Sequence, residues 1–151
     1  MPVNQLWIDP DYRSLFNRST IFDDMRAVEG DIFRIGKGRV TQRFEINDHV
    51  LFLKRHSGIG WREIFKDLIQ GRLPVVGAIN EWHALERLQI LNISSLTPVA
   101  FGQRGVNPAT RESFLVTREL RNTISLEDLV KTWQQRSDFI KIKRAILRQL
   151  A

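Results

Sequence analysis

The spacing of apolar residues between residues 31 and 120 predicts both strands and helices. Short apolar or alternating runs bounded by Gly, Asn and Asp are typical of strands, and apolar residues repeating every three to four positions are typical of amphipathic helices. The helical pattern covers Trp61 to Gln70, which Gly71 ends, and about Ala78 to Leu91. The predicted strands are Asp31–Ile35, Arg39–Ile46, Val50–Arg55, Pro98–Gly102 and Ser113–Thr117.

The order of these elements predicts an α+β fold. Three strands form an antiparallel meander, an inserted helix and a long helix follow the third strand, and two strands complete a five-stranded antiparallel sheet. We expect residues 1–30 to form an amino-terminal extension that is loosely helical from Leu6 to Glu29. Residues 31–120 form the main lobe. Residues 121–151 add helices, the first N-capped by Ser125 with Asp128 in the capping-box position.

Lys54 ends an otherwise apolar strand, so its side chain points the same way as Val50 and Phe52. An unpaired buried charge is costly, and the lysine therefore needs an anionic partner, either a carboxylate or a phosphate. In kinases, a lysine on the third strand contacts nucleotide phosphates and pairs with a helical glutamate. The alternative is a lysine at a strand end that reaches water.

Glu81 is the carboxylate that helical geometry favours as the partner of Lys54, 27 residues earlier (81 − 54). It shares a helix face with the apolar Leu85 and Leu88, at i+4 and i+7. Glu63 lies off the apolar stripe of its helix and is expected to be solvated. The alternative for Glu81 is a surface residue at a helix start, where the macrodipole favours acids.

Gly36 and Gly38, followed by Arg39, form a glycine-rich turn between the first two predicted strands, 16 residues before Lys54 (54 − 38). Such turns let backbone N–H groups approach phosphate oxygens. The third glycine of the protein-kinase pattern is missing, and a plain hairpin turn is the alternative.

Composition and charge narrow the function classes. With 151 residues and 42% hydrophobic content, the chain is long enough for one domain with a core. The absence of cysteine excludes disulfides and thiolate metal sites, and we expect a cytoplasmic protein. The net charge of +6 indicates an anionic partner such as nucleotide phosphates, an anionic glycolipid or the anionic cytoplasmic leaflet of a membrane. No base-reading motif is present, so nucleic acid is the weaker alternative.

Several segments resemble the lipopolysaccharide core heptose(I) kinases of Gram-negative bacteria. The resemblance runs from about Leu6 to the last residue and keeps both the order and the spacing of the segments. The segments are Phe52-Leu-Lys-Arg-His56, Trp61-Arg-Glu-Ile-Phe-Lys-Asp-Leu68, Leu73-Pro-Val-Val-Gly-Ala78, Glu81-Trp-His-Ala84, Phe101-Gly-Gln-Arg-Gly-Val-Asn-Pro108 and Thr123-Ile-Ser-Leu-Glu-Asp128. The resemblance implies a protein-kinase-like fold that uses ATP and Mg²⁺ to phosphorylate an inner-core heptose at the cytoplasmic face of the inner membrane. It leaves open whether the acceptor is heptose I, heptose II or Kdo.

The same resemblance assigns roles to individual residues. Lys54 would contact the phosphates with Glu81 as its partner, and the backbone of Thr117, Arg118, Glu119 and Leu120 would be the hinge that pairs with adenine. The glycine turn gains less support, because relatives vary there.

The chain contains no histidine-arginine-aspartate run, and its three histidines lack metal-ligand spacing. We expect the chain to be the amino-terminal half of such a kinase and inactive alone, with the catalytic aspartate and the Mg²⁺ ligands after Ala151. Residues 137–151 would begin the carboxy-terminal lobe. Their apolar stripe, Phe139, Ile142, Ile146 and Leu150, is expected to pair with a second copy of the chain or to be disordered.

A non-catalytic interaction module with a kinase-like lobe is an alternative function, and a basic nucleic-acid-binding domain is a weaker one.

Overall fold

The computed structural model describes residues 3–120, 123, 126–131 and 138–150. The chain divides into two compact units, residues 1–119 and 120–151. Each unit is described by itself.

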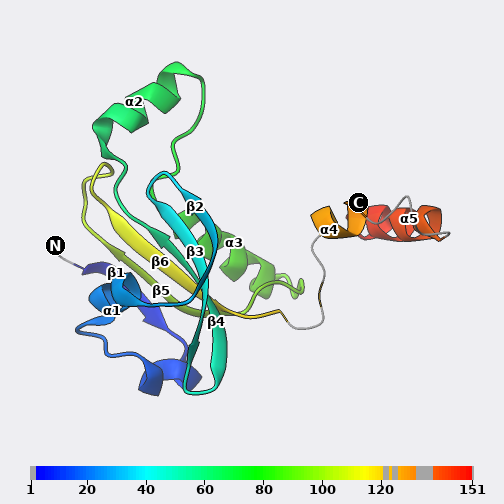
Figure 1. Cartoon of the computed structure of the whole chain (residues 1–151), viewed down its shortest axis with the longest axis horizontal. Helices are drawn as coiled ribbons and strands as arrows, with labels where there is room; N and C mark the ends of the chain where they lie inside the picture. The colour runs from blue at the N-terminus through cyan, green and yellow to red at the C-terminus, as the bar shows by residue number, and fades with distance from the viewer. Residues whose placement is uncertain (1–2, 121–122, 124–125, 132–137, 151) are drawn as a thin grey trace. The chain divides into compact units, whose positions relative to one another are not determined.

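The first unit is built on a six-stranded sheet in which every neighbouring pair is antiparallel (Figure 1). The strand order across the sheet is β1-β5-β6-β4-β3-β2, so the meander β2–β4 lies on one side and β1 occupies the opposite edge. The strands are β1 (Val3–Ile8), β2 (Asp31–Gly36), β3 (Arg39–Ile46), β4 (His49–His56), β5 (Pro98–Arg104) and β6 (Glu112–Arg118).

Two sequence predictions were wrong at the amino terminus. The sheet has six strands instead of five, and the segment expected to be loosely helical from Leu6 to Glu29 begins within the extra strand β1. β1 pairs with β5, with Leu6 opposite Gly102 and Trp7 opposite Phe101. A 3-10 helix, Pro10–Leu15, and α1, Ile21–Ala27, follow, so the rest of the segment is partly helical. The strand was missed because its partner is far away in the sequence.

The other predicted strands and both predicted helices of the first unit are confirmed within one or two residues. α2 runs from Gly60 to Ile69 and α3 from Ile79 to Ile90. Gly71, which follows α2, has a positive φ of 67°, a conformation that glycine adopts without strain.

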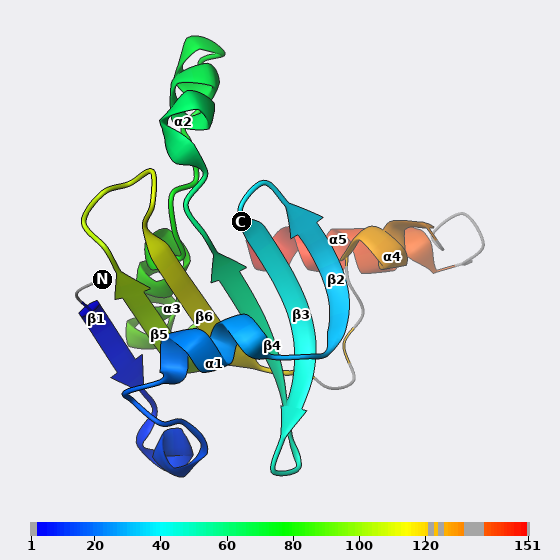
Figure 2. The same ribbon diagram turned by 60° about the vertical axis from the view of Figure 1, so that its left-hand side comes forward.

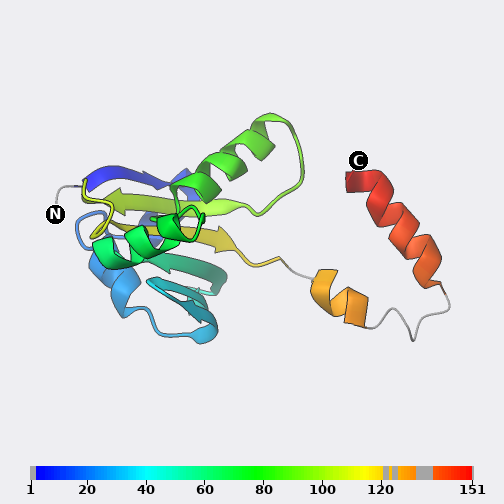
Figure 3. The same cartoon turned by 90° about the horizontal axis from the view of Figure 1, so that it is seen from above.

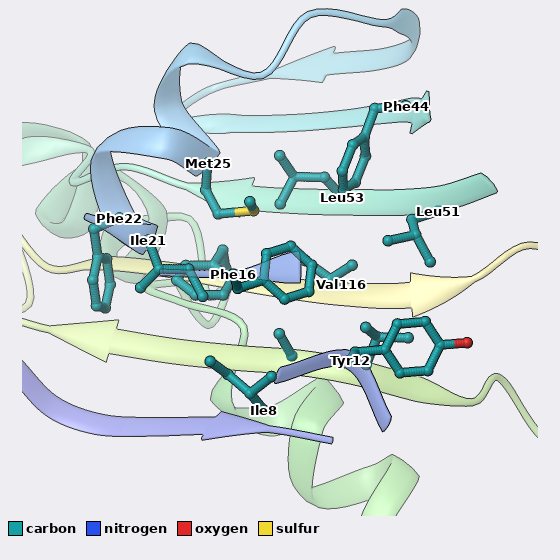
Figure 4. Packing of buried hydrophobic residues seen from close by; sticks show 13 residues of the cluster. Ile8, Tyr12, Phe16, Ile21, Phe22, Met25, Phe44, Leu51, Leu53 and Val116 are labelled. Carbon is teal, nitrogen blue, oxygen red and sulfur yellow. The ribbon is translucent and has the colours of Figure 1, made fainter. Parts of the chain in front are cut away.

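One face of the sheet is closed by α1 and the segments on either side of it (Figure 4). β4 directs Leu51 and Leu53 toward this face, where both are almost completely buried. Ile21, Phe22 and Met25 from α1 pack against them in the same cluster. The deepest core therefore lies on the face of β4 that Lys54 does not share.

The opposite face of the sheet carries α3 and a smaller core (Figure 3). Trp82 of α3 is buried and stacks on Phe101 of β5, with ring centroids 5.0 Å apart and an angle of 12° between the planes. The ring of Trp7 in β1 also packs near Trp82, with ring centroids 4.8 Å apart. These aromatic contacts hold α3 on the sheet.

The second unit contains α4, Leu126–Lys131, and α5, Phe139–Leu150. The predicted cap Ser125 lies outside the described residues. In the stripe of the last helix, Ile142 is half-buried, whereas the side chains of Phe139, Ile146 and Leu150 are not among those described. Its pairing with a second copy stays a prediction. Among the described residues, no helix is long and apolar enough to cross a membrane.

We predict that Trp82→Ala lowers the free energy of unfolding by about 3–5 kcal/mol, because it removes the buried aromatic that joins α3 to the sheet. Trp61→Ala is the matched control. Trp61 is 49% exposed on α2, and its loss should cost roughly 1 kcal/mol or less. Urea unfolding of both variants measures the difference, and equal losses would contradict the role given to Trp82.

Candidate functional site

Lys54 and Glu81 meet on the α3 face of the sheet, as the sequence predicted. Lys54 Nζ donates a hydrogen bond to Glu81 Oε1 and forms an ion pair with it. The side chains are 30% and 34% exposed, so the pair is sheltered but open to solvent on one side. β4 places Lys54 on the same face as Val50 and Phe52, and Glu81 lies in the first turn of α3.

The pair lines a cavity of about 320 Å³ between the β2–β3 hairpin and the start of α3. Three cationic side chains and one carboxylate line it, which leaves an excess of positive charge. Such a lining suits a ligand that carries several negative charges. The charged side chains of the lining are Arg34, Arg39, Lys54 and Glu81, and the other lining residues include Gly36, His56, Val75, Gly77 and Asn80.

The two glycines of the predicted phosphate turn, Gly36 and Gly38, occupy different surroundings, and only Gly38 is required for a steric reason. Gly38 has a φ of 60°, and a Cβ at this position would lie 2.5 Å from the carbonyl oxygen of Ser57. Gly38 is therefore required by the turn and by its close contact with the loop after β4. Gly36 lines the cavity, and a Cβ there would meet only the Arg39 side chain, at 3.9 Å.

Lys37, between these glycines, forms an ion pair with Glu63 of α2. The hydrogen bond from Lys37 lowers the pKa of Glu63, and the same bond raises the pKa of Lys37. Glu63 was expected to be solvated; it is partly exposed, and it also connects α2 to the glycine turn. The 26-residue separation of the pair explains why local patterns did not reveal it.

A hydrogen bond inside the sheet–helix interface fixes the start of α3. Ser113 Oγ of β6 accepts a hydrogen bond from the backbone N–H of Ala78, with a donor–acceptor distance of 2.9 Å, and both residues are buried. Gly77 allows this approach, because a Cβ on it would lie 3.1 Å from Ser113 Oγ. Glu81 follows three residues later, so this contact helps to set its position. Sequence reasoning missed both Gly77 and Ser113.

His56, opposite Ser113 in the β4–β6 pairing, also lines the cavity. Within the described part of the chain, its buried Nδ1 has no hydrogen-bond partner. Burial lowers the pKa of His56, and the nearby charges of Arg39 and Lys54 lower it further, against the opposing effect of Glu81. The imidazole is therefore held neutral beside two cations.

The residues predicted as the hinge follow β6. Thr117 is buried opposite Phe52, on the Lys54 face of the sheet. Glu119 Oε1 accepts a hydrogen bond from Arg43 Nε at 2.7 Å, and its backbone N–H donates to the carbonyl oxygen of Val50 at 3.3 Å. Leu120 is 52% exposed and begins the second unit.

An apolar surface that the sequence did not indicate lies beside Thr117. Phe33 of β2 packs against Phe52 of β4, with ring centroids 5.2 Å apart. Phe33 is 64% exposed, and the two rings, inclined at 59° to each other, form an apolar surface on the face that carries Lys54. Among the described residues, no group of three or more His, Asp or Glu side chains could hold a metal ion.

A family model for the lipopolysaccharide kinase (Kdo/WaaP) family matches residues 23–151. The chain belongs to this family. The heptose(I) kinase resemblance proposed from the sequence is thereby confirmed at family level.

Curated relatives agree with the family assignment. The chain is 38% identical, over 147 residues, to the lipopolysaccharide core heptose(I) kinase WaaP of Pseudomonas aeruginosa, a match covering 97% of this chain and 55% of that protein. It is 37% identical to WaaP of Escherichia coli over 140 residues, or 93% of this chain and 53% of that protein. The chain thus spans about half the length of these relatives.

A solved structure, "WaaP in complex with acyl carrier protein", matches with a TM-score of 0.70 and 32% identity, covering 94% of this chain and 52% of that chain. The α+β fold with its antiparallel sheet is therefore similar to that of a solved member of the Kdo/WaaP family.

We predict that Gly38→Ala lowers the free energy of unfolding by about 1–3 kcal/mol, because a positive φ and a backbone clash strain the alanine. Gly36→Ala is the matched control, with an expected change of less than roughly 1 kcal/mol. Thermal or urea unfolding compares the two. A Gly38→Ala variant as stable as Gly36→Ala would contradict the structural role given to Gly38.

We predict that His56 makes folding stability depend on pH below its ordinary pKa of 6.5. Because its pKa is lower in the folded state, the unfolded chain binds the proton more readily, so stability is present above 6.5 and falls as the pH drops toward the folded-state value. Urea unfolding at several pH values should show a flatter profile for His56→Gln than for the unsubstituted chain. A profile for His56→Gln as steep as that of the unsubstituted chain would contradict this role.

Proposed function

We propose that this chain provides the ATP-binding lobe of a lipopolysaccharide core heptose kinase. The observation that carries the proposal is the Lys54–Glu81 ion pair inside a cavity with excess positive charge, in a chain of the lipopolysaccharide kinase family. ATP supplies the phosphoryl group in such a reaction, and the whole transfer also needs an acceptor site and metal ligands.

The arrangement of elements supports a kinase-like amino-terminal lobe. A lysine on β4 pairs with a glutamate on α3, the helix between the third and fourth strands of the lobe counted from β2. The glycine turn joins β2 to β3, and β4, which carries the lysine, is the next strand in the chain. These are the parts by which kinases hold the nucleotide phosphates.

Each residue of the cavity has a proposed role. Lys54 places its ammonium against the phosphates, and Glu81 keeps that ammonium in position. Arg34 and Arg39 add positive charge at the phosphate end, and the backbone at Gly36 leaves room for close approach. His56, held neutral, adds no repulsion to the cationic lining.

The adenine is proposed to bind beyond Lys54 toward the end of β6. Phe52, two positions before Lys54, and the adjoining Phe33 offer an apolar surface for a base. The backbone N–H groups of Arg118 and Glu119 already donate to Thr97 and Val50, so pairing with adenine at residues 117–120 would use the remaining N–H and C=O groups. The hinge assignment of Thr117, Glu119 and Leu120 stays a proposal.

The acceptor is proposed to be an inner-core heptose of lipopolysaccharide, since the named relatives are heptose(I) kinases. Mg²⁺ is the proposed metal. The proposed location is the cytoplasmic face of the inner membrane. One solved relative is a complex with acyl carrier protein, and we add this protein to the proposed partners, which the sequence had not suggested.

We predict that Lys54→Met lowers kcat/KM about 10²–10³-fold in a full-length protein that carries this segment, because the phosphates lose a positioned cation. Glu81→Ala should lower it about 10²-fold by releasing the lysine. The double variant should be hardly worse than Lys54→Met, since the two residues act together. Phosphate transfer from ATP to a dephosphorylated core oligosaccharide is the measurement.

Glu86→Ala is the matched control, since Glu86 lies on the same helix and contacts His83 instead. It should keep nearly full activity. Fully additive losses from Lys54→Met and Glu81→Ala would show that the two residues do not act as a unit. Unchanged activity in Lys54→Met would exclude the proposed nucleotide site.

A further inference from the structure

α2 exposes an apolar face that the rest of the described chain does not cover. Ile64 is buried at one edge of this face, and the exposed fraction rises across it to 86% at Ile69. Trp61, Phe65 and Leu68 lie between them and are 49%, 57% and 50% exposed. In both Figure 1 and Figure 2, α2 projects beyond the end of the sheet. These residues form what we term the α2 face.

The charges of α2 are sorted around this face. At about 100° per residue, Arg62 and Lys66 follow directly after Ile69, the most exposed edge. Glu63 and Asp67 lie next to Ile64, the buried edge. Both basic residues are exposed and both acidic residues are half-buried. The exposed edge of the α2 face is therefore bordered by positive charge alone.

We propose that the α2 face docks on the anionic surface of a lipid bilayer. A helix of this kind lies in the plane of the interface, with its apolar side chains below the headgroups. Trp61 and Phe65 suit the interface, where aromatic rings are enriched. Arg62 and Lys66 would lie at the level of the lipid phosphates, and their long stems can cover apolar surface while the charge stays in the polar layer.

The segment that follows α2 connects this surface to the nucleotide cavity. Leu73 is 90% exposed and extends the apolar surface, and Val75 is 47% exposed and also lines the cavity. Lys37 of the glycine turn contacts Glu63 on the side of α2 away from Ile69. Docking would therefore bring the bilayer to the end of the lobe that holds the phosphates. The inference rests on the proposed function in one respect, since a kinase with a lipid-linked acceptor has to reach that acceptor at a membrane surface.

The test is binding of the 151-residue chain, without nucleotide, to vesicles of phosphatidylcholine alone or mixed with phosphatidylglycerol. We expect binding to the anionic vesicles that weakens with salt. The variant Trp61→Ser/Phe65→Ser/Ile69→Ser should lower the partition coefficient at least roughly tenfold, because it removes the apolar anchor. Arg62→Glu/Lys66→Glu should remove the preference for anionic vesicles. Cosedimentation measures both effects.

Ile90→Ser/Leu91→Ser/Val106→Ser is the matched control. It removes side chains that are 70%, 51% and 74% exposed on other elements, and it should bind vesicles like the unsubstituted chain. Lys54→Met should also keep vesicle binding while losing affinity for nucleotide, so the two proposals can fail separately. Unfolding midpoints show whether each variant is folded.

Three results would overturn the docking proposal. One is equal vesicle binding by the serine variant of α2 and the control variant. Another is equal binding to neutral and anionic vesicles. The third is protection of Trp61 from acrylamide quenching in the full-length protein without vesicles, which would mean that another part of the protein covers the α2 face.

Discussion

The ion pair between Lys54 and Glu81 is the interaction on which the candidate site depends. A sheltered ammonium without a counter-charge is unfavourable, and so is a sheltered carboxylate, so each residue makes the other tolerable in this position. Neither element creates the pair alone, because β4 fixes the direction of Lys54 and the position of α3 on the sheet decides whether Glu81 can reach it. The stacking of Trp82, adjacent to Glu81, and the hydrogen bond from Ala78 to Ser113 set that position. The packing of α3 is thus part of the site.

The two faces of β4 carry different kinds of side chain. The face covered by α1 contains nearly fully buried apolar side chains such as Leu51 and Leu53. On the α3 face, the neighbouring positions of β4 carry Phe52, Lys54 and His56, all half-exposed. A closed core on one side lets the other side keep charged groups and open space, since the strand is already held in place. Substitutions at Leu51 and Leu53 should therefore act through folding, and those at Lys54 and Glu81 mainly through binding.

Local patterns were sufficient for the parts of this structure that local sequence decides. The bounds of β3, α2 and α3 follow from hydrophobic periodicity. Strand alternation and helical spacing favoured Glu81 as the partner of Lys54, and the family resemblance was needed to choose it over a surface position. The strand β1 was missed because Trp7 finds its neighbours Phe101 and Trp82 only through the tertiary fold. Ser113 escaped notice for the same reason, since it acts on Ala78 from 35 residues away.

The glycine turn illustrates how one short motif can serve two purposes. Gly38 is needed for a turn that packs against Ser57, whereas Gly36 borders the cavity. Lys37 between them contacts Glu63, so the turn is also linked to α2. That link is a solvent-exposed ion pair, which contributes little stability and weakens with salt. Only Ile64 of the apolar stripe of α2 is buried, so few buried contacts hold this helix. A surface bound at the α2 face would lie beside Glu63, the partner of Lys37, and beside the segment that carries Val75, so the docking surface and the phosphate end of the cavity share one edge of the lobe.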